Sequence, residues 1–207
     1  MNRLVIIGAG GHGKVIADTA TSLCKWSEIV FLDDRFEQGL RQIAKWQVIG
    51  PISQLTSINT TNEVVIGIGN NVVRENLFTQ ILQLGLALPS VIHPTAYISP
   101  YSKIDCGTVV FAQAVVNIDA HIGRGCIINT AATIDHDCRI ADFCHLSPGV
   151  HLAGATKIGQ RSWLGIGSVT KQLVEIGQDC VIGAGAAVVQ NVYNGTTVVG
   201  VPAHLKS

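Results

Sequence analysis

The sequence predicts an α/β domain with a small parallel sheet over residues 1–90 and an all-β parallel β-helix over residues 91–207. Two observations predict these fold classes. Short apolar runs alternate with helical patterns in the first part of the chain, and aliphatic residues recur every six positions in the second part. Pro89 and Pro94 lie where one pattern replaces the other, so we place the domain boundary near residue 90.

The α/β domain begins with a buried strand, Leu4 to Ile7, which a glycine-rich loop connects to a helix from about Lys14 to Leu23. Further strands are expected at residues 28–32 and 64–68. A second helix follows, and its expected apolar face consists of Val73, Leu77, Ile81 and Leu84. This spacing is typical of an amphipathic helix. Strands that alternate with helices predict a small, Rossmann-like parallel sheet.

The loop after the first strand carries a possible phosphate-binding motif. Gly8, Gly10 and Gly13 satisfy G-x-G-x-x-G, and Asp33 lies twenty residues beyond, where a ribose-binding acid is expected. The ligand could be NAD or a nucleotide-sugar diphosphate, and a tight turn that binds nothing is a third possibility. We favour the nucleotide sugar, because a dinucleotide fold needs two mononucleotide halves and 90 residues hold little more than one.

The second domain is built on a six-residue repeat. Stepping by six from Ile92 to Val188 gives seventeen positions, of which sixteen are aliphatic, and four residues after each comes a small residue or valine. Neither a helix nor a simple alternating strand has this period. We expect each hexapeptide to form one flat side of a prism and three to form a coil of eighteen residues, with stacked coils paired as parallel strands.

Glycines and cysteines of the repeat are interpreted structurally. Nine glycines are expected at corners that need unusual backbone angles: Gly123, Gly125, Gly149, Gly159, Gly165, Gly167, Gly177, Gly183 and Gly185. Four of the six cysteines occupy the small-residue series, namely Cys126, Cys138, Cys144 and Cys180. No C-x-x-C pair occurs, so we expect small buried side chains rather than zinc ligands.

Composition excludes several classes of protein. With 47% hydrophobic and 14% charged residues, the chain is not intrinsically disordered. Fourteen basic residues balance fourteen acidic ones, which argues against nucleic acid or an anionic membrane as a partner. The apolar runs are too short for a membrane span, and glycines break the N-terminal run too early for a signal peptide. We therefore expect a cytoplasmic protein.

A glycine-rich α/β domain followed by a hexapeptide β-helix resembles the sugar O-acyltransferase and aminosugar N-acetyltransferase family. The segments that carry the resemblance are IIGAGGHGKVIAD, FLDD, IGIGNN, NTAATIDHDCRIADFCHLSPGVHLAG and GVPA. The family includes sialic acid O-acetyltransferases and bacillosamine-type enzymes that acetylate UDP-4-amino sugars. The resemblance covers essentially the whole chain. It implies a left-handed β-helix, a homotrimer, and acetyl-CoA bound between neighbouring β-helices.

The resemblance also implies roles for particular residues. His136 matches the general base, and Asp137 matches the acid that raises its basicity, although related aminosugar enzymes carry Glu there. His145 matches a histidine beside the thioester of the cofactor, and Ile166 and Ala184 match positions that line the cofactor groove. The residues that match nucleotide-sugar contacts are Gly10, Gly11, His12, Asp33, Asp34 and Gly69.

The histidines can also be interpreted without the family. His136 lies between Asp135 and Asp137, and a neighbouring carboxylate raises the pKa of an imidazole toward that of a useful base. His145 lies nine residues later, half a coil away, so the two cannot share one face. We expect both on the outside of the prism, with the site completed across a subunit interface. A purely structural role of His145 is the alternative.

The expected β-helix domain contains two further patterns. Gly149, Gly167 and Gly185 are one coil apart, and their bare backbone could carry a pantetheine arm or could reflect repeated corner geometry. The gaps between histidines from His93 to His151 are 28, 15, 9 and 6, which lack the close pair of a gamma-type carbonic anhydrase. We therefore expect no metal.

The sequence thus predicts an acetyl-CoA-dependent N-acetyltransferase that acts on a UDP-linked amino sugar, with His136 as general base. Two alternatives stay open. One is the same chemistry on a hydroxyl group, as in sialic acid O-acetylation. The other is a trimeric scaffold that binds a nucleotide sugar without catalysis.

Overall fold

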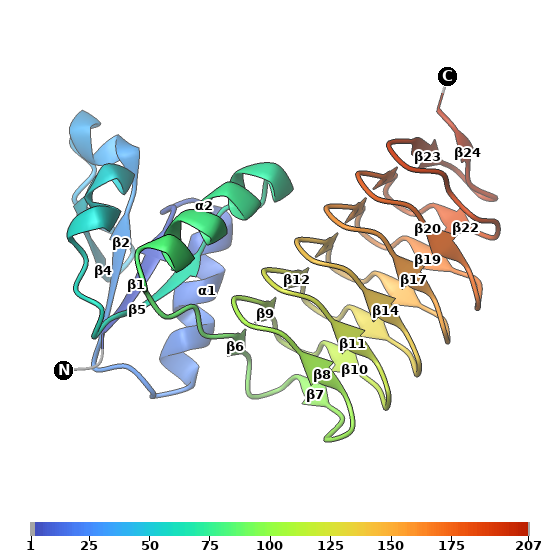
Figure 1. Ribbon diagram of the computed structural model, residues 1–207, viewed down its shortest axis with the longest axis horizontal. Coiled ribbons are helices and arrows are strands. Elements are labelled where there is room, and N and C mark those ends of the chain that lie inside the picture. Colours follow the sequence, from blue (N-terminus) through green and yellow to red (C-terminus); the bar gives the residue numbers. More distant parts are fainter. Residues whose placement is uncertain (1–2, 207) are drawn as a thin grey trace. The chain divides into compact units, whose positions relative to one another are not determined.

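The computed structural model describes residues 3–206. The chain divides into two compact units, of which the first ends at Pro94 and the second begins at Thr95 (Figure 1). No helix among the described residues is both long and apolar enough to span a membrane.

The first unit is built on a five-stranded sheet in the order β3-β4-β2-β1-β5. Its elements in chain order are β1 (Arg3–Ile7), α1 (Gly11–Ser22), β2 (Glu28–Leu32), η1 (Asp34–Gln38), β3 (Gln42–Ile43), β4 (Trp46–Gly50), η2 (Ile52–Ser57), β5 (Glu63–Ile66), α2 (Asn71–Gln83) and β6 (Val91–Ile92). All strand pairs in this sheet are parallel except β3–β4. The predicted small parallel sheet is confirmed, and β3 and β4 extend it beyond the strands that the sequence indicated.

The helix α1 begins three residues earlier than predicted. The N–H of Lys14 donates to the carbonyl of Gly10 at 3.0 Å, so the glycine-rich loop leads directly into the first helical turn. Gly10 is the N-cap residue. The glycines that the sequence assigned to a loop therefore lie at a helix N-terminus, where backbone N–H groups are unpaired within the helix.

The predicted apolar face of α2 was partly wrong. Val73 is 42% exposed, whereas Arg74 is buried together with Leu77 and Ile81. The Arg74 guanidinium donates to the carbonyls of Ile68 and Gly69 at 3.2 and 2.9 Å. A long apolar stem can pack in a core when its charged end satisfies buried carbonyls, which a hydrophobicity pattern does not reveal.

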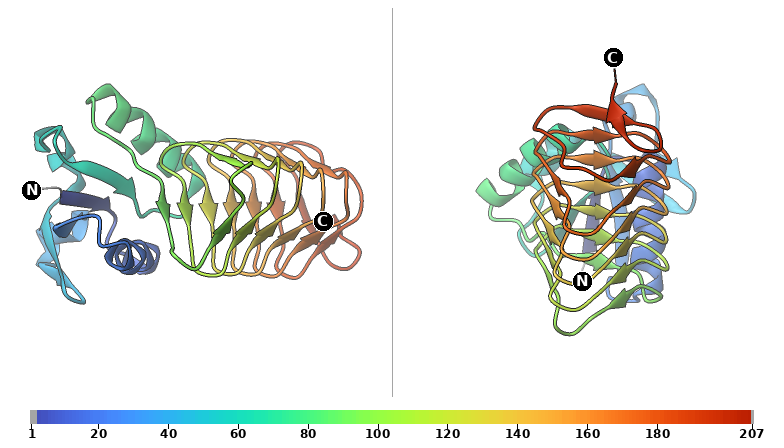
Figure 2. Two further views of the ribbon diagram at one scale, coloured as in Figure 1. Left: turned by 90° about the horizontal axis from the view of Figure 1, so that it is seen from below. Right: turned by 90° about the vertical axis from the view of Figure 1, so that its right-hand side faces the viewer.

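The second unit is a parallel β-helix in which short strands stack in three sheets (Figure 2). Its strands are β7 (Tyr97–Ile98), β8 (Lys103–Ile104), β9 (Val109–Val110), β10 (Val115–Val116), β11 (His121–Ile122), β12 (Ile127–Ile128), β13 (Thr133–Ile134), β14 (Arg139–Ile140), β15 (His145–Leu146), β16 (His151–Leu152), β17 (Lys157–Ile158), β18 (Trp163–Leu164), β19 (Val169–Thr170), β20 (Glu175–Ile176), β21 (Val181–Ile182), β22 (Ala187–Val188), β23 (Thr197–Val199) and β24 (His204–Leu205). Paired strands lie eighteen residues apart through most of the stack, as in Val115↔Thr133, so the predicted three-hexapeptide coil is confirmed.

The core of the β-helix contains the two residue series that the repeat defines. Ile122, Ile134 and Leu146 from the aliphatic series are fully buried. The small residues fill the space beside them, and the four cysteines of that series are buried as expected, whereas Cys24 and Cys106 are exposed. The repeat is therefore a packing device, because each coil repeats the same shapes eighteen residues later.

The glycines of the repeat fall into two groups, which corrects the expectation that all serve unusual backbone angles. Gly149, Gly167 and Gly185 each have a φ of +66°. Gly159 and Gly165 do not, and a Cβ atom on Gly159 would lie 2.4 Å from the backbone N of Gln178 in the next coil. Glycine occurs in the second group because stacked coils leave no room for a side chain.

Candidate functional site

A cavity of about 470 Å³ opens at the carboxyl ends of β1, β2 and β5. This edge of a parallel sheet is where α/β folds bind ligands. The cavity is lined by all six residues that the sequence matched to nucleotide-sugar contacts, which are Gly10, Gly11, His12, Asp33, Asp34 and Gly69. Arg35, Gln38 and Ile52 line it as well, and sequence analysis did not single them out.

The glycines of the loop have different roles. A Cβ atom on Gly13 would lie 2.0 Å from the carbonyl oxygen of Gly8, so this glycine permits the close packing of β1 and α1. A Cβ atom on Gly10 or Gly11 would meet no atom within 4 Å. These two positions leave open space above the N-terminus of α1, and such a helix end attracts anions.

Asp33 is held by several donors of the protein. Its Oδ2 atom accepts from the backbone N of Ala9 at 2.7 Å, and its Oδ1 atom accepts from the backbone N of Arg35 at 3.0 Å. The guanidinium of Arg35 adds two bonds, from Nε to Oδ1 at 2.8 Å and from Nη2 to Oδ2 at 2.9 Å. Arg35 lowers the pKa of Asp33 to about 2, against the opposing effect of burial, so this carboxylate stays ionised.

The neighbouring Asp34 has a different environment from Asp33. It is exposed, and its Oδ1 atom accepts a hydrogen bond from the backbone N of Ile52 at 2.9 Å. Gly69, on the opposite strand end, is fixed through its carbonyl by Arg74. The cavity therefore combines bare backbone, a helix N-terminus and an accessible carboxylate.

The β-helix carries an exposed imidazole–carboxylate pair. His136 lies in the turn between β13 and β14, and its Nδ1 atom is 2.8 Å from Oδ2 of Asp137. The hydrogen bond with Asp137, together with the charge of Asp135, raises the pKa of His136. Asp137 adopts a φ of 60°, a left-handed conformation that aspartate tolerates. The short side chain of Asp137 thus reaches the imidazole directly.

Two neighbouring residues hold this turn. The Oδ1 atom of Asp135 accepts from the backbone N of His136 at 2.8 Å and from Nδ2 of Asn117 at 3.0 Å. Asn117 lies one coil before Asp135, so a contact between coils fixes the residue before the histidine. Sequence analysis did not single out Asn117, although its eighteen-residue spacing from Asp135 could have indicated it.

Gly154 provides the surface on which the His136 ring lies. A Cβ atom at this position would lie 2.6 Å from both Cε1 and Nε2 of the imidazole. Gly154 follows His136 by eighteen residues, so it occupies the same corner of the next coil. Sequence analysis missed it, because this role depends on how the coils stack.

His145 lies on the outer face of β15, in register with Trp163 of the next coil, as expected. It is nevertheless only 9% exposed, because the indole of Trp163 stacks on its ring with centroids 5.4 Å apart. The indole is fixed in turn, since its Nε1 donates to Oγ of Ser147 at 2.8 Å. The Nε2 atom of His145 lies 3.4 Å from Nδ2 of Asn129. His145 lies in β15, whereas His136 lies in the turn between β13 and β14, which belong to the other two sheets, so the two do not share one face, as their half-coil spacing predicted.

Ile166 and Ala184 occupy one corner of consecutive coils. The N–H of Gly185 donates to the carbonyl of Ile166 at 2.8 Å, so the two corners are in register. Ile166 is 58% exposed. No atom lies within 4 Å of a Cβ placed on Gly167 or Gly185. The positive φ of Gly149, Gly167 and Gly185 supports the interpretation as repeated corner geometry. The open strip of backbone beside Gly167 and Gly185 also supports a place for a pantetheine arm.

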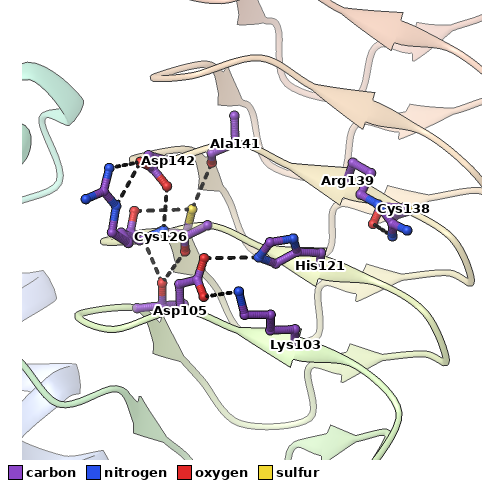
Figure 3. Close-up of polar contacts among 11 residues, drawn as sticks. Lys103, Asp105, His121, Cys126, Cys138, Arg139, Ala141 and Asp142 are labelled. Carbon is purple, nitrogen blue, oxygen red and sulfur yellow. Dashed lines mark hydrogen bonds and ion pairs between the residues drawn. The ribbon is translucent and has the colours of Figure 1, made fainter.

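A further polar cluster lies on the sheet that contains β8, β11 and β14 (Figure 3). Asp105 contacts Nζ of Lys103 at 3.1 Å and Nε2 of His121 at 3.0 Å. Arg124 pairs with Asp142 one coil later. A groove of about 630 Å³ runs along the same face, and none of the predicted site residues lines it. Within residues 3–206, no three His, Cys, Asp or Glu side chains are grouped so as to hold a metal ion.

The chain is similar to proteins of known structure along its whole length. The model of the PglD N-terminal domain family matches residues 3–81. The acetyltransferase domain of PglB from Neisseria gonorrhoeae FA1090 is 41% identical, with complete coverage of both chains (100%) and a TM-score of 0.97. The perosamine N-acetyltransferase of Caulobacter crescentus is 34% identical, and the match covers 98% of that chain. The chain belongs to the hexapeptide-repeat sugar N-acetyltransferases.

Other members of this family have been solved with ligands. The PglB domain was determined in complex with acetyl coenzyme A, with 42% identity, 100% coverage of both chains and a TM-score of 0.96. PerB from Caulobacter crescentus was determined with CoA and GDP-perosamine, with 34% identity, a TM-score of 0.91, and coverage of 100% of this chain and 98% of PerB.

A curated relative adds a second substrate class. The UDP-N-acetylbacillosamine N-acetyltransferase of Bacillus subtilis (strain 168) is 35% identical over 119 residues, which is 54% of this chain and 52% of the relative. The match thus spans about half the length of that protein. The family resemblance seen in the sequence is confirmed, and so is the enzyme class, at the level of this sugar N-acetyltransferase family. The solved relatives bind acetyl-CoA or CoA.

Proposed function

We propose that the chain transfers the acetyl group of acetyl-CoA to the amino group of a UDP-linked amino sugar, of the UDP-4-amino-sugar type. The observation that carries the proposal is the exposed His136–Asp137 pair, with its 2.8 Å contact and raised imidazole pKa. Such a base is what an amine needs to attack a thioester. The relatives that bind acetyl-CoA and GDP-perosamine support the classes of donor and acceptor.

In the proposed mechanism, Asp137 keeps the proton of His136 on Nδ1, so that Nε2 is the free base atom. The acceptor nitrogen attacks the thioester carbonyl, and a C–N bond forms as the amine proton passes to Nε2. The tetrahedral intermediate collapses with cleavage of the C–S bond, and the CoA sulfur leaves with the proton that His136 returns. Backbone N–H groups stabilise the oxyanion.

The proposed donor site lies along the open strip beside Ile166 and Ala184. An exposed isoleucine and bare backbone suit a pantetheine arm, which is thin, partly apolar and able to hydrogen-bond to peptide groups. His145 is assigned to the thioester end of the donor. Its stacking on Trp163 and its contact with Asn129 fix the plane of its ring.

The proposed nucleotide site is the cavity of the first unit. The backbone N–H groups of Gly10 and Gly11 at the start of α1 bind the diphosphate, and His12 lies in the same turn. We assign the ribose to Asp34 rather than Asp33. An ionised carboxylate offers about four acceptor positions, and those of Asp33 already receive the four donors described above.

The proposal is tested by the release of free thiol from acetyl-CoA in the presence of candidate acceptors. UDP-4-amino sugars are expected to support turnover, whereas UDP-sugars with only hydroxyl groups are not. Turnover with a CMP-linked or free sialic acid, and with no amine acceptor, would show O-acetylation. Tight binding of UDP-amino sugars without release of thiol from any panel member would favour the non-catalytic scaffold.

The substitution Gly154→Ala is expected to lower kcat by about 10²-fold. The added Cβ displaces the Cε1–Nε2 edge of the His136 ring, which lies against Gly154, and a misplacement of about 1 Å has an effect of this size. The fold is expected to persist, since the displaced atoms belong to an exposed side chain. Gln172→Ala, at the same corner one coil further, is the matched control. Normal kcat in Gly154→Ala would show that the position of the imidazole is unimportant.

We also propose a homotrimer in which neighbouring β-helices share the donor site. Trp163 and Val181 are neighbours in the parallel register and are 47% and 41% exposed, and together with Ile166 they give this region an apolar surface. Such patches are typical of protein interfaces. Light scattering is expected to give about three times 21.9 kDa. A fully active monomer would contradict the shared site.

A further inference from the structure

Arg35 is a charged residue of the nucleotide cavity that neither the sequence motifs nor the proposed mechanism uses. It lies in η1, directly after the end of β2, and its side chain is 49% exposed. It lines the cavity together with Gly10 and Asp34. An arginine at this place either contacts the ligand or is directed away from it. The hydrogen bonds between Arg35 and Asp33 decide where the remaining N–H groups of the guanidinium lie.

The pairing with Asp33 fixes the guanidinium in the wall of the cavity. Nε and Nη2 face the two carboxylate oxygens of Asp33 at 2.8 and 2.9 Å, which is a bidentate arrangement. Ala9 also holds that carboxylate through its backbone N. The plane of the guanidinium is therefore set by the glycine-rich loop itself. A planar group with a fixed partner loses little further entropy when it binds a ligand.

Three of the five N–H groups of Arg35 are not used by Asp33: both on Nη1 and one on Nη2. They form the far edge of the guanidinium, opposite the carboxylate. This edge offers only donors, so it favours ligand atoms that accept hydrogen bonds. It also disfavours amino groups, because two donors that face each other leave both unsatisfied.

The position of Arg35 in the fold indicates which part of a nucleotide it meets. The diphosphate is expected at the N-terminus of α1, which follows β1. In a βαβ nucleotide-binding unit the ribose lies near the end of the second strand, so the base lies beyond it. Arg35 follows the second strand, β2, and belongs to the ribose and base end of the cavity.

We propose that Arg35 selects the nucleobase by donating hydrogen bonds to the carbonyl oxygen at C4 of uracil or C6 of guanine, and so favours these two bases over cytosine and adenine. This inference rests on the proposed nucleotide-sugar function. Uracil and guanine carry a carbonyl oxygen where cytosine and adenine carry an amino group. The two nucleotides named among the relatives, UDP and GDP, both have a base of the first kind.

The proposal is tested by calorimetry of the whole chain with UDP, CDP and inorganic pyrophosphate, without acetyl-CoA. The unsubstituted protein is expected to bind UDP at least about tenfold more tightly than CDP, since a hydrogen bond to a charged donor supports a difference of this order. Arg35→Met keeps the apolar stem and removes the donors, and Arg35→Lys keeps the charge and removes the fork. Both are expected to bring the UDP-to-CDP ratio close to one.

Arg3→Met is the matched control, because Arg3 also pairs with a carboxylate, Glu28, at 2.7 Å but does not line the cavity. Its UDP-to-CDP ratio is expected to match that of the unsubstituted protein. Pyrophosphate affinity is expected to be unchanged in Arg35→Lys. Circular dichroism checks that each variant folds. The preference of the unsubstituted protein for UDP over CDP tests the proposal even if Arg35→Met does not fold.

The possible failures differ from one another. Equal affinity of the unsubstituted protein for UDP and CDP would overturn base selection and leave the proposed function intact. A parallel loss of UDP, CDP and pyrophosphate affinity in both Arg35 variants would assign Arg35 to the phosphates instead. If the unsubstituted protein bound none of the three probes, both this inference and the nucleotide-sugar function would be overturned.

Discussion

Replacing His136 by alanine is expected to lower kcat by about 10²–10⁴-fold, which is the usual effect of removing a positioned general base. KM for acetyl-CoA is expected to change little, because the proposed donor strip is formed by other residues. Steady-state thiol release measures both quantities. His151→Ala is the matched control, since His151 is another exposed histidine of the β-helix, with its Nδ1 atom 2.8 Å from Oγ1 of Thr133.

The pH dependence of the same reaction tests the role of Asp137. His136 acts as a base only when neutral, so kcat/KM is expected to rise as the pH passes through its pKa. Hydrogen bonding by Asp137, with the charge of Asp135, places this pKa above the ordinary value of 6.5. Asp137→Asn removes the first of these effects, so the rise is expected at lower pH and with a smaller loss of kcat than in His136→Ala. Asparagine tolerates the left-handed φ of this position.

The alanine variant also distinguishes the two possible acceptors. It is expected to lose the rise that belongs to His136 and to recover in part at high pH, where more of a free amine is already deprotonated. A hydroxyl acceptor would show no such recovery. Turnover of His136→Ala equal to that of the unsubstituted protein would remove this residue from the mechanism and make His145 the next candidate.

The substitution Gly10→Val is expected to abolish binding of UDP. A Cβ at this position meets no protein atom within 4 Å, and the backbone φ of −81° suits any residue, so the variant is expected to fold. The added side chain instead occupies the space through which the diphosphate approaches the backbone. Calorimetry measures the loss of affinity, and the β-helix is expected to keep its oligomeric state.

Two further variants make this experiment specific. Gly10→Ala adds a smaller group and is expected to give an intermediate loss. Ser22→Val adds the same valine at the other end of α1 and is expected to leave affinity unchanged. Unchanged affinity of Gly10→Val for UDP would support a turn that binds nothing, and binding of NAD in place of UDP would support an oxidoreductase.

Much of the β-helix could be predicted because its repeat is local and uninterrupted. Ile122, Ile134 and Leu146 recur at a fixed period, and each is buried in the same way in its own coil. The first unit was less predictable, since its boundaries depend on capping and on exceptions to hydrophobicity. The start of α1 at Gly11 and the buried Arg74 of α2 are both of this kind.

The candidate site was predictable where its parts are adjacent in the chain. Asp137 follows His136 directly, so the pair was visible as a motif, and the structure adds the 2.8 Å contact. The glycines after β1 were visible for the same reason. Gly154 was not, because nothing near His136 in the sequence shows that its ring lies on the next coil. The burial of His145 by Trp163 has the same origin.

The sequence by itself determined the two fold classes, the eighteen-residue coil and the family resemblance, because these follow from periodicity and from short contiguous motifs. Only the tertiary structure decided that the carboxylate oxygens of Asp33 accept hydrogen bonds from Ala9 and Arg35, and that Arg35 lines the cavity. The physical reason is that a hydrogen bond depends on distance and direction in space. Ala9 and Asp33 are 24 positions apart, and the backbone N of Ala9 comes within 2.7 Å of Oδ2 of Asp33 only when parallel strands align their carboxyl ends.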